Sequence, residues 1–150
     1  MLKKIFLFLT IALSCLMAGD IEVNSAYIRA VPPNMPNSIA YMKIINHSDK
    51  AIYLKRADST VAKNLELHRH TMEKGMMVMR HVPNIKISAH SFTMLKPGGF
   101  HIMVIGLKRH IKKHDFVKKI NLYFSNGEKI TLQNVPVKSV MSGMNMKKMK

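Results

Sequence analysis

The stretch LKPGGFHIMVIGL, residues 95–107, contains a turn followed by a segment with two different faces. The turn has the proline and glycine composition of a tight reversal. If the segment after it is extended, Ile102 and Val104 point to one side while His101 and Met103 point to the other, because side chains alternate along a strand. The stretch therefore predicts a β-strand with an apolar core face and an outer face that carries imidazole and thioether.

Outward from this strand, the chain consists of short segments rich in β-branched and aromatic residues, without a sustained 3.6-residue apolar period. The loop VPPNMPN contains three prolines, which forbid a strand there. Asn126-Gly127 is the strongest hairpin signal. We expect an all-β sandwich or barrel around a single core. The expected strands besides 100–107 are 21–30, 39–46, 51–57, 121–125 and 128–132.

The first 19 residues have the organisation of a secretory signal peptide. Lys3 and Lys4 precede the apolar run from Ile5 to Leu13, and small residues follow it. The expected division is a leader at 1–19, a β domain at 20–138 and a flexible tail rich in methionine and lysine at 139–150. The mature protein is therefore expected in the periplasm.

The chain has one cysteine, Cys15, inside the leader. Its surroundings faintly resemble a lipoprotein acceptor site, but the usual leucine is one place late, so cleavage after residue 17, 18 or 19 is preferred. Such cleavage leaves no cysteine in the mature chain. Disulfides are then excluded, and so is a blue-copper electron-transfer site, which requires a thiolate ligand.

The formal net charge of the chain is +16, and loss of Lys3 and Lys4 with the leader lowers it by two to +14. Nucleic acid is not an expected partner of an exported protein, and the basic residues are spread along the chain. We expect a solvated basic surface that can attract an acidic partner or an anionic membrane surface.

A second segment, residues 65–82, contains three histidines and four methionines. If it is extended, His68 and His70 share one face, as do Met77, Met79 and His81. Thioether sulfur together with imidazole nitrogen suits Cu(I), whereas eight acidic residues in the whole chain are too few for an oxygen cage.

The spacing of the histidines and methionines indicates which of them belong to the metal site. His68, Met79, His101 and Met103 form the pattern H-x10-M-x21-H-x-M, which resembles the signature of the periplasmic copper chaperone A family. The resemblance runs from about residue 21 to 138, through AYIRAVPPNMPNSIAYMKIIN, LELH, GMMVMRHV, LKPGGFHIMVIGLK and FSNGEKITLQNVPV.

This resemblance implies a cupredoxin-like Greek-key β-barrel or sandwich and a surface Cu(I) site formed by His68, Met79, His101 and Met103. It also implies delivery of copper to cytochrome oxidase, either to a copper-accepting oxidase subunit or through a thioredoxin-like copper assembly factor. Tyr27 stands where many relatives have tryptophan. Catalysis is not expected, because the chain has no H-E-x-x-H or G-x-S-x-G motif and no paired carboxylates near the histidines.

Some alternatives stay open at this point. A protein that sequesters copper for tolerance, without a dedicated acceptor, would use the same ligands. His70, Met72 or Met77 could replace a primary ligand. The four tail methionines form M-x2-M-x-M-x2-M and could hold a second copper ion; they are Met141, Met144, Met146 and Met149.

Overall fold

A computed structural model describes residues 19–139 of the protein. The predicted leader up to residue 18, with Cys15, and the tail methionines lie outside this range. Between residues 19 and 139 all regular structure is β, and no helix there could span a membrane. The strands are β1 (Ile21–Arg29), β2 (Asn37–Asn46), β3 (Ile52–Asp58), β4 (Ala62–Glu73), β5 (Met76–His81), β6 (Ile85–Ile87), β7 (Ser91–Leu95), β8 (Phe100–Leu107), β9 (Phe116–Phe124) and β10 (Lys129–Lys138).

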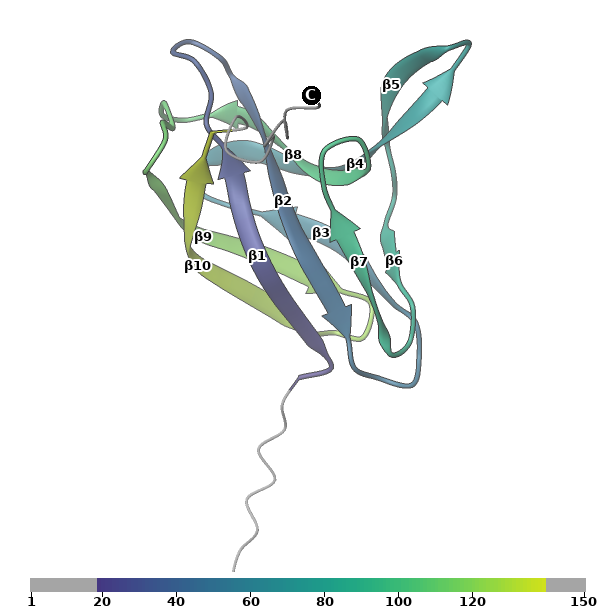
Figure 1. Cartoon of the computed structure of the whole chain (residues 1–150). Coiled ribbons are helices and arrows are strands. Elements are labelled where there is room, and N and C mark those ends of the chain that lie inside the picture. The colour runs from purple at the N-terminus through teal and green to yellow at the C-terminus, as the bar shows by residue number, and fades with distance from the viewer. Residues whose placement is uncertain (1–18, 140–150) are drawn as a thin grey trace, which may run out of the picture.

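The strands form one sheet that closes on itself (Figure 1). The circuit of pairings is β4-β8-β2-β1-β10-β9-β3, and the pair Ala57↔Leu65 returns β3 to β4. All of these pairings are antiparallel except the one between β1 and β10. The barrel places the two histidine-bearing strands, β4 and β8, next to each other although about 30 residues separate them in sequence.

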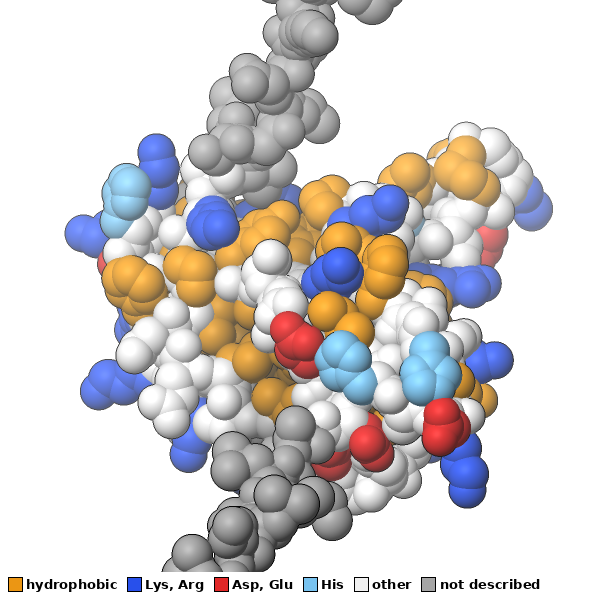
Figure 2. All heavy atoms as spheres, turned by 60° about the horizontal axis from the view of Figure 1, so that its bottom comes forward, with side chains coloured by type: hydrophobic (Ala, Val, Ile, Leu, Met, Phe, Trp, Pro, Cys, Tyr) orange, Lys and Arg blue, Asp and Glu red, His pale blue; other side chains and the backbone are white. Residues whose placement is uncertain are grey.

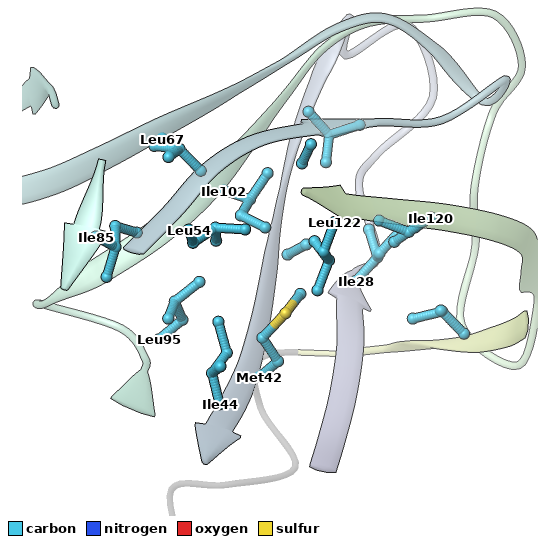
Figure 3. Packing of buried hydrophobic residues seen from close by; sticks show 14 of the residues in the cluster. Ile28, Met42, Ile44, Leu54, Leu67, Ile85, Leu95, Ile102, Ile120 and Leu122 are labelled. Atoms are coloured by element: carbon cyan, nitrogen blue, oxygen red, sulfur yellow. The ribbon is translucent and has the colours of Figure 1, made fainter. Parts of the chain in front are cut away.

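The barrel interior is filled by aliphatic side chains from nearly every strand (Figure 3). Leu67 of β4, Ile102 of β8 and Leu54 of β3 are at most 3% exposed. Burying a side chain of this size contributes roughly 1.5–3 kcal/mol to folding. The inner faces of β4 and β8 are thus fixed by core packing, and this fixes the direction of their outer faces as well.

The prediction of an all-β barrel is confirmed, and the strand Phe100–Leu107 has the predicted bounds. The Asn126-Gly127 hairpin is also confirmed, with Lys129 opposite Tyr123 and Gly127 at φ 86°. The proline-containing segment is the loop between β1 and β2.

The predicted list of strands lacked β4 to β7; residues 65–82 were expected to share faces only if extended, and β4 and β5 show that they are extended. β6 has only three residues, too few for an alternating pattern to be visible. β7 pairs antiparallel with β2 and is only partly covered. On the molecular face in Figure 2, lysine and arginine side chains are scattered over the face and along its edge, as expected for a solvated basic surface.

Candidate metal site

The candidate site begins with the register of β4 and β8. His68 lies directly opposite His101, and Glu66 lies opposite Met103. Leu67 and Ile102, which alternate with these residues, point into the core. The outer face of the strand pair therefore carries the imidazoles of His68 and His101 side by side, as the alternation in the sequence predicted.

The β4–β5 hairpin supplies the remaining predicted residue. Its turn is Lys74-Gly75, with φ angles of 49° and 78°, so both residues adopt the left-handed conformation of a tight hairpin turn. In the resulting register Met79 lies opposite His70, and His81 lies opposite His68. The hairpin projects from the barrel beyond β8 (Figure 1).

Four histidine rings gather where β5, β4 and β8 run side by side. The ring centroids of His68 and His101 are 5.9 Å apart, and those of His70 and His101 are 4.8 Å apart. The ring of His81 is 5.7 Å from that of His68. His101 is thus in contact range of two imidazoles from the neighbouring strand.

Hydrogen bonds determine which nitrogen each ring can offer. Nε2 of His68 donates to the Glu66 carboxylate at 2.9 Å, and Nδ1 of His101 donates to the carbonyl oxygen of Gly99 at 3.1 Å. The other nitrogen of each ring, His68 Nδ1 and His101 Nε2, is buried and has no hydrogen-bond partner in the protein. In a neutral imidazole, when one nitrogen carries the proton the other has a free lone pair. Each of these two rings therefore has one nitrogen that can bind a metal.

The carbonyl oxygen of Gly99 makes a second contact. It also accepts the backbone N–H of His70 at 3.2 Å. This one oxygen therefore connects the end of the KPGG turn to β4 and orients the ring of His101 in the same place.

His101 is fully buried, with 0% of its surface exposed. The resemblance implied a site at the surface. The complete burial of His101 differs from that expectation. Burial lowers the pKa of His101, and the nearby rings of His70 and His68 lower it further, against the opposing effect of the Gly99 hydrogen bond. A lowered pKa favours the neutral imidazole, which is the form that binds metal.

The two predicted methionines differ in exposure. Met79 is 45% exposed, whereas Met103 is half-buried between β4 and β2. Met103 lies two residues from His101 on the same face of β8, and Met79 is diagonal to His68 across the hairpin. Such diagonal neighbours are within reach of long side chains, at roughly 7–8 Å between backbones.

The structure therefore places all four predicted residues on one face of three neighbouring strands, with the ring centroids of the two histidines 5.9 Å apart. In the described part of the chain, no three histidine, cysteine or acidic side chains already surround a common metal position. An ion bound at this face needs methionine sulfur as a ligand, or a rotation of side chains toward it.

Two residues next to the ligand set were missing from the predicted site, Glu66 as a partner of His68 and Gly99 as a partner of His101. Glu66 could have been found in the sequence, because it lies two residues before His68 and shares its face of the strand. The contact of His70 with His101 depends on the register between β4 and β8, which the sequence does not reveal.

Comparison with known proteins identifies the family. Residues 21–137 match the family described as "Putative lipoprotein LpqE-like". The chain is 30% identical over 129 residues to the "Putative lipoprotein Lxx21020" of Leifsonia xyli subsp. xyli, a match that covers 85% of this chain and 75% of that protein. The chain belongs to the LpqE-like family.

Solved structures with the same fold connect this LpqE-like protein to copper-binding domains. It is 33% identical to DR1885 from Deinococcus radiodurans. The match to the apo structure of DR1885 includes 85% of this chain and 84% of DR1885, with a TM-score of 0.63. DR1885 has also been solved with Cu(I), again at a TM-score of 0.63 over 78% of this chain and 77% of DR1885.

The copper-bound PCuAC domain of PmoF2 is similar in structure, with a TM-score of 0.67 at 17% sequence identity. This match includes 81% of the LpqE-like chain and 94% of the PmoF2 domain. At that identity the likeness concerns the fold. The predicted fold of the periplasmic copper chaperone A family, a cupredoxin-like barrel, is confirmed.

Proposed function

We propose that this LpqE-like protein is an exported Cu(I)-binding metallochaperone that supplies copper for cytochrome oxidase assembly. Its ligands are His68, Met79, His101 and Met103. The protein is a carrier that performs no catalysis and acts in the periplasm. The copper ion is cargo, received from one protein and passed to another.

The observation that carries this proposal is the pair His68 and His101. Each ring holds a buried nitrogen with a free lone pair, and the two rings lie side by side on a face that also carries Met79 and Met103. Two imidazoles with two thioethers suit Cu(I), a soft ion. The relation to DR1885, a protein solved in both apo and Cu(I) forms, supports the choice of metal.

The exposures of the ligands suggest how copper is handed over. Met79 is the most exposed of the four, whereas His101 is fully buried. An incoming ligand from an acceptor protein can replace Met79 first, while His101 still holds the ion. Copper then moves by exchange of ligands and does not pass through water as a free ion. A neutral thioether also binds copper less tightly than a thiolate, which favours release.

The test is a Cu(I) titration of the purified protein against a competing chelator. We expect Met79→Ala and His101→Ala each to weaken binding by at least about tenfold, because each removes a direct ligand. Met35→Ala and His90→Ala are matched controls, because Met35 is 52% exposed on the β1–β2 loop and His90 pairs with Asp49 outside the site. Unchanged affinity in both site variants would reject the assigned ligands.

Delivery and sequestration are separated by a second measurement. The Cu(I)-loaded protein is mixed with the soluble copper-binding domain of an oxidase subunit, or with a thioredoxin-like copper assembly factor. A carrier transfers copper through a direct complex, so the transfer rate rises with acceptor concentration. A sequestering protein releases copper at one rate whatever the acceptor concentration, and this result would favour a role in tolerance.

A further inference from the structure

One side chain beside the proposed ligands has no assigned role, although its surroundings are those of a ligand. His70 lies on the same face of β4 as His68, and its ring is the nearest imidazole to His101, at 4.8 Å. Its Nδ1 is buried and has no hydrogen-bond partner. Unpaired buried polar atoms are uncommon in proteins and call for an explanation at each position.

Three buried imidazole nitrogens therefore lack partners in one small region: Nδ1 of His68, Nδ1 of His70 and Nε2 of His101. The rings of His68 and His70 each lie within 5.9 Å of the ring of His101. We propose that His70 is a third imidazole ligand, which allows this face of the barrel to bind Cu(II) through His68, His70 and His101 in addition to Cu(I) through the histidine and methionine set. This inference rests on the proposed copper-binding function.

The chemistry of the donors supports two modes of binding. Imidazole nitrogen is a good ligand for Cu(II), whereas neutral thioether sulfur is selective for Cu(I). A set of two histidines and two methionines favours the reduced ion, and a third nitrogen shifts the preference toward the oxidised one. The two sets share His68 and His101, so a single ion occupies the face at a time.

The structure indicates how the third ring can join the other two. The three nitrogens do not yet surround one point. His101 is fixed by burial and by its bond to Gly99, and His68 is held by Glu66, but no side-chain hydrogen bond holds the ring of His70. The ring of His70 is half-buried and can rotate about its side-chain torsions toward the two fixed rings.

The neighbouring histidine provides a matched control. His81 is also outside the predicted ligand set, and its ring lies 5.7 Å from that of His68. It is exposed, however, and neither of its nitrogens is among the buried unpartnered atoms. His70→Ala and His81→Ala therefore remove the same group from the same hairpin, and only the first is expected to affect Cu(II).

The experiment titrates wild type, His70→Ala and His81→Ala, purified without a histidine tag, with Cu(II) and separately with Cu(I). Electron paramagnetic resonance of the Cu(II) form reports the nitrogen ligands. We expect wild type to bind Cu(II) with three imidazole nitrogens. We expect His70→Ala to lose at least about tenfold in Cu(II) affinity and one nitrogen from the spectrum, with less than about threefold change for Cu(I). His81→Ala should resemble wild type with both ions.

Other outcomes would overturn the inference in distinguishable ways. Wild type that binds Cu(I) but not Cu(II) would reject the third ligand and leave the proposed function intact. Wild type that binds neither ion would reject the proposed function itself. Equal losses for both ions in His70→Ala would make His70 part of one common site, and a loss in His81→Ala alone would assign the third nitrogen to His81.

Discussion

Glu66 accepts a hydrogen bond from Nε2 of His68 at 2.9 Å, and Nδ1 of the same ring is left buried without a hydrogen-bond partner. Carboxylates that bond to a metal-binding histidine fix its tautomer and raise its basicity. Glu66 is therefore expected to affect copper binding without touching the ion.

We predict that Glu66→Ala weakens Cu(I) binding by about tenfold, as is typical when the partner of a ligand histidine is removed. Glu66→Gln should have a smaller effect, because its amide oxygen still accepts the bond. The matched control is Glu22→Ala. Glu22 lies on β1, and its carboxylate accepts a hydrogen bond from His47 at 2.8 Å, so this variant also removes the carboxylate partner of a histidine. Equal affinities of the Glu66→Ala and Glu22→Ala variants would show that the contact has no influence on the ligand.

The burial of His101 predicts how the stability of the metal-free protein depends on pH. Its pKa is lowered in the folded state, whereas in the unfolded chain it is near the ordinary value of about 6.5. Below that value the unfolded chain binds a proton that the folded protein resists, so falling pH favours unfolding. Above pH 6.5 both states are neutral and His101 causes no loss of stability.

Denaturant unfolding of the metal-free protein at pH 7.5, 6.5 and 5.5 measures this effect. We expect the free energy of unfolding to fall between pH 6.5 and 5.5 by more in wild type than in His101→Leu, which places a similar apolar volume in the buried position. Parallel pH profiles of the two proteins would contradict a depressed pKa at this residue. Protons should correspondingly compete with copper for His101 only at lower pH than they would for an ordinary imidazole.

The methionines at the end of the hairpin are predicted to influence the rate of copper uptake. Met72 and Met77 lie opposite each other, at 65% and 61% exposure, on the hairpin face that also carries His70 and Met79. Soft exposed thioethers can receive Cu(I) before it reaches the buried imidazoles. The double variant Met72→Ala/Met77→Ala should take up Cu(I) from a chelator several-fold more slowly, with unchanged equilibrium affinity.

Stopped-flow transfer from a coloured Cu(I) chelator measures that rate. Met35→Ala serves as the control for a comparably exposed methionine on a distant loop. If the hairpin variant and wild type take up copper equally fast, the exposed methionines have no part in uptake.

The two faces of β8 predict that stability and copper binding can be changed separately. Ile102 is fully buried in the core, whereas Ile105 lies on the same strand and is half-buried. Ile102→Val should lower the free energy of unfolding by about 1 kcal/mol, with a smaller loss for Ile105→Val. Thermal unfolding and Cu(I) titration of the two variants check this. A large loss of copper affinity in Ile102→Val would show that core packing and the outer face are coupled.

Much of the fold was predictable because its signals are local. The alternation in Phe100–Leu107 identified both faces of β8, and Asn126-Gly127 identified the hairpin between β9 and β10. The short strand β6 carries no such signal, since the three residues Ile85–Ile87 are too few to display a period. Local patterns thus predicted the elements but not every member of the sheet.

For the candidate site, the sequence predicted which residues belong to it but not how they are buried or which of them lie close together. Spacing selected His68, Met79, His101 and Met103, and their ligand roles stay a prediction. That these residues share a face follows from a barrel that brings β4 beside β8, which is a long-range pairing. The burial of His101 and the closeness of His70 depend on this register and on the covering chain, so composition and period could not reveal them.

The shared carbonyl oxygen of Gly99 has a consequence for protein engineering. Because this oxygen orients the ring of His101 and also holds the backbone of His70, the KPGG turn belongs to the proposed metal-binding unit although it contributes none of the proposed ligands. A designer who grafts only the histidines and methionines onto another barrel would transfer donor atoms without the scaffold that aims them. The smallest transplantable unit is the β4–β5 hairpin together with β8 and the turn that precedes it.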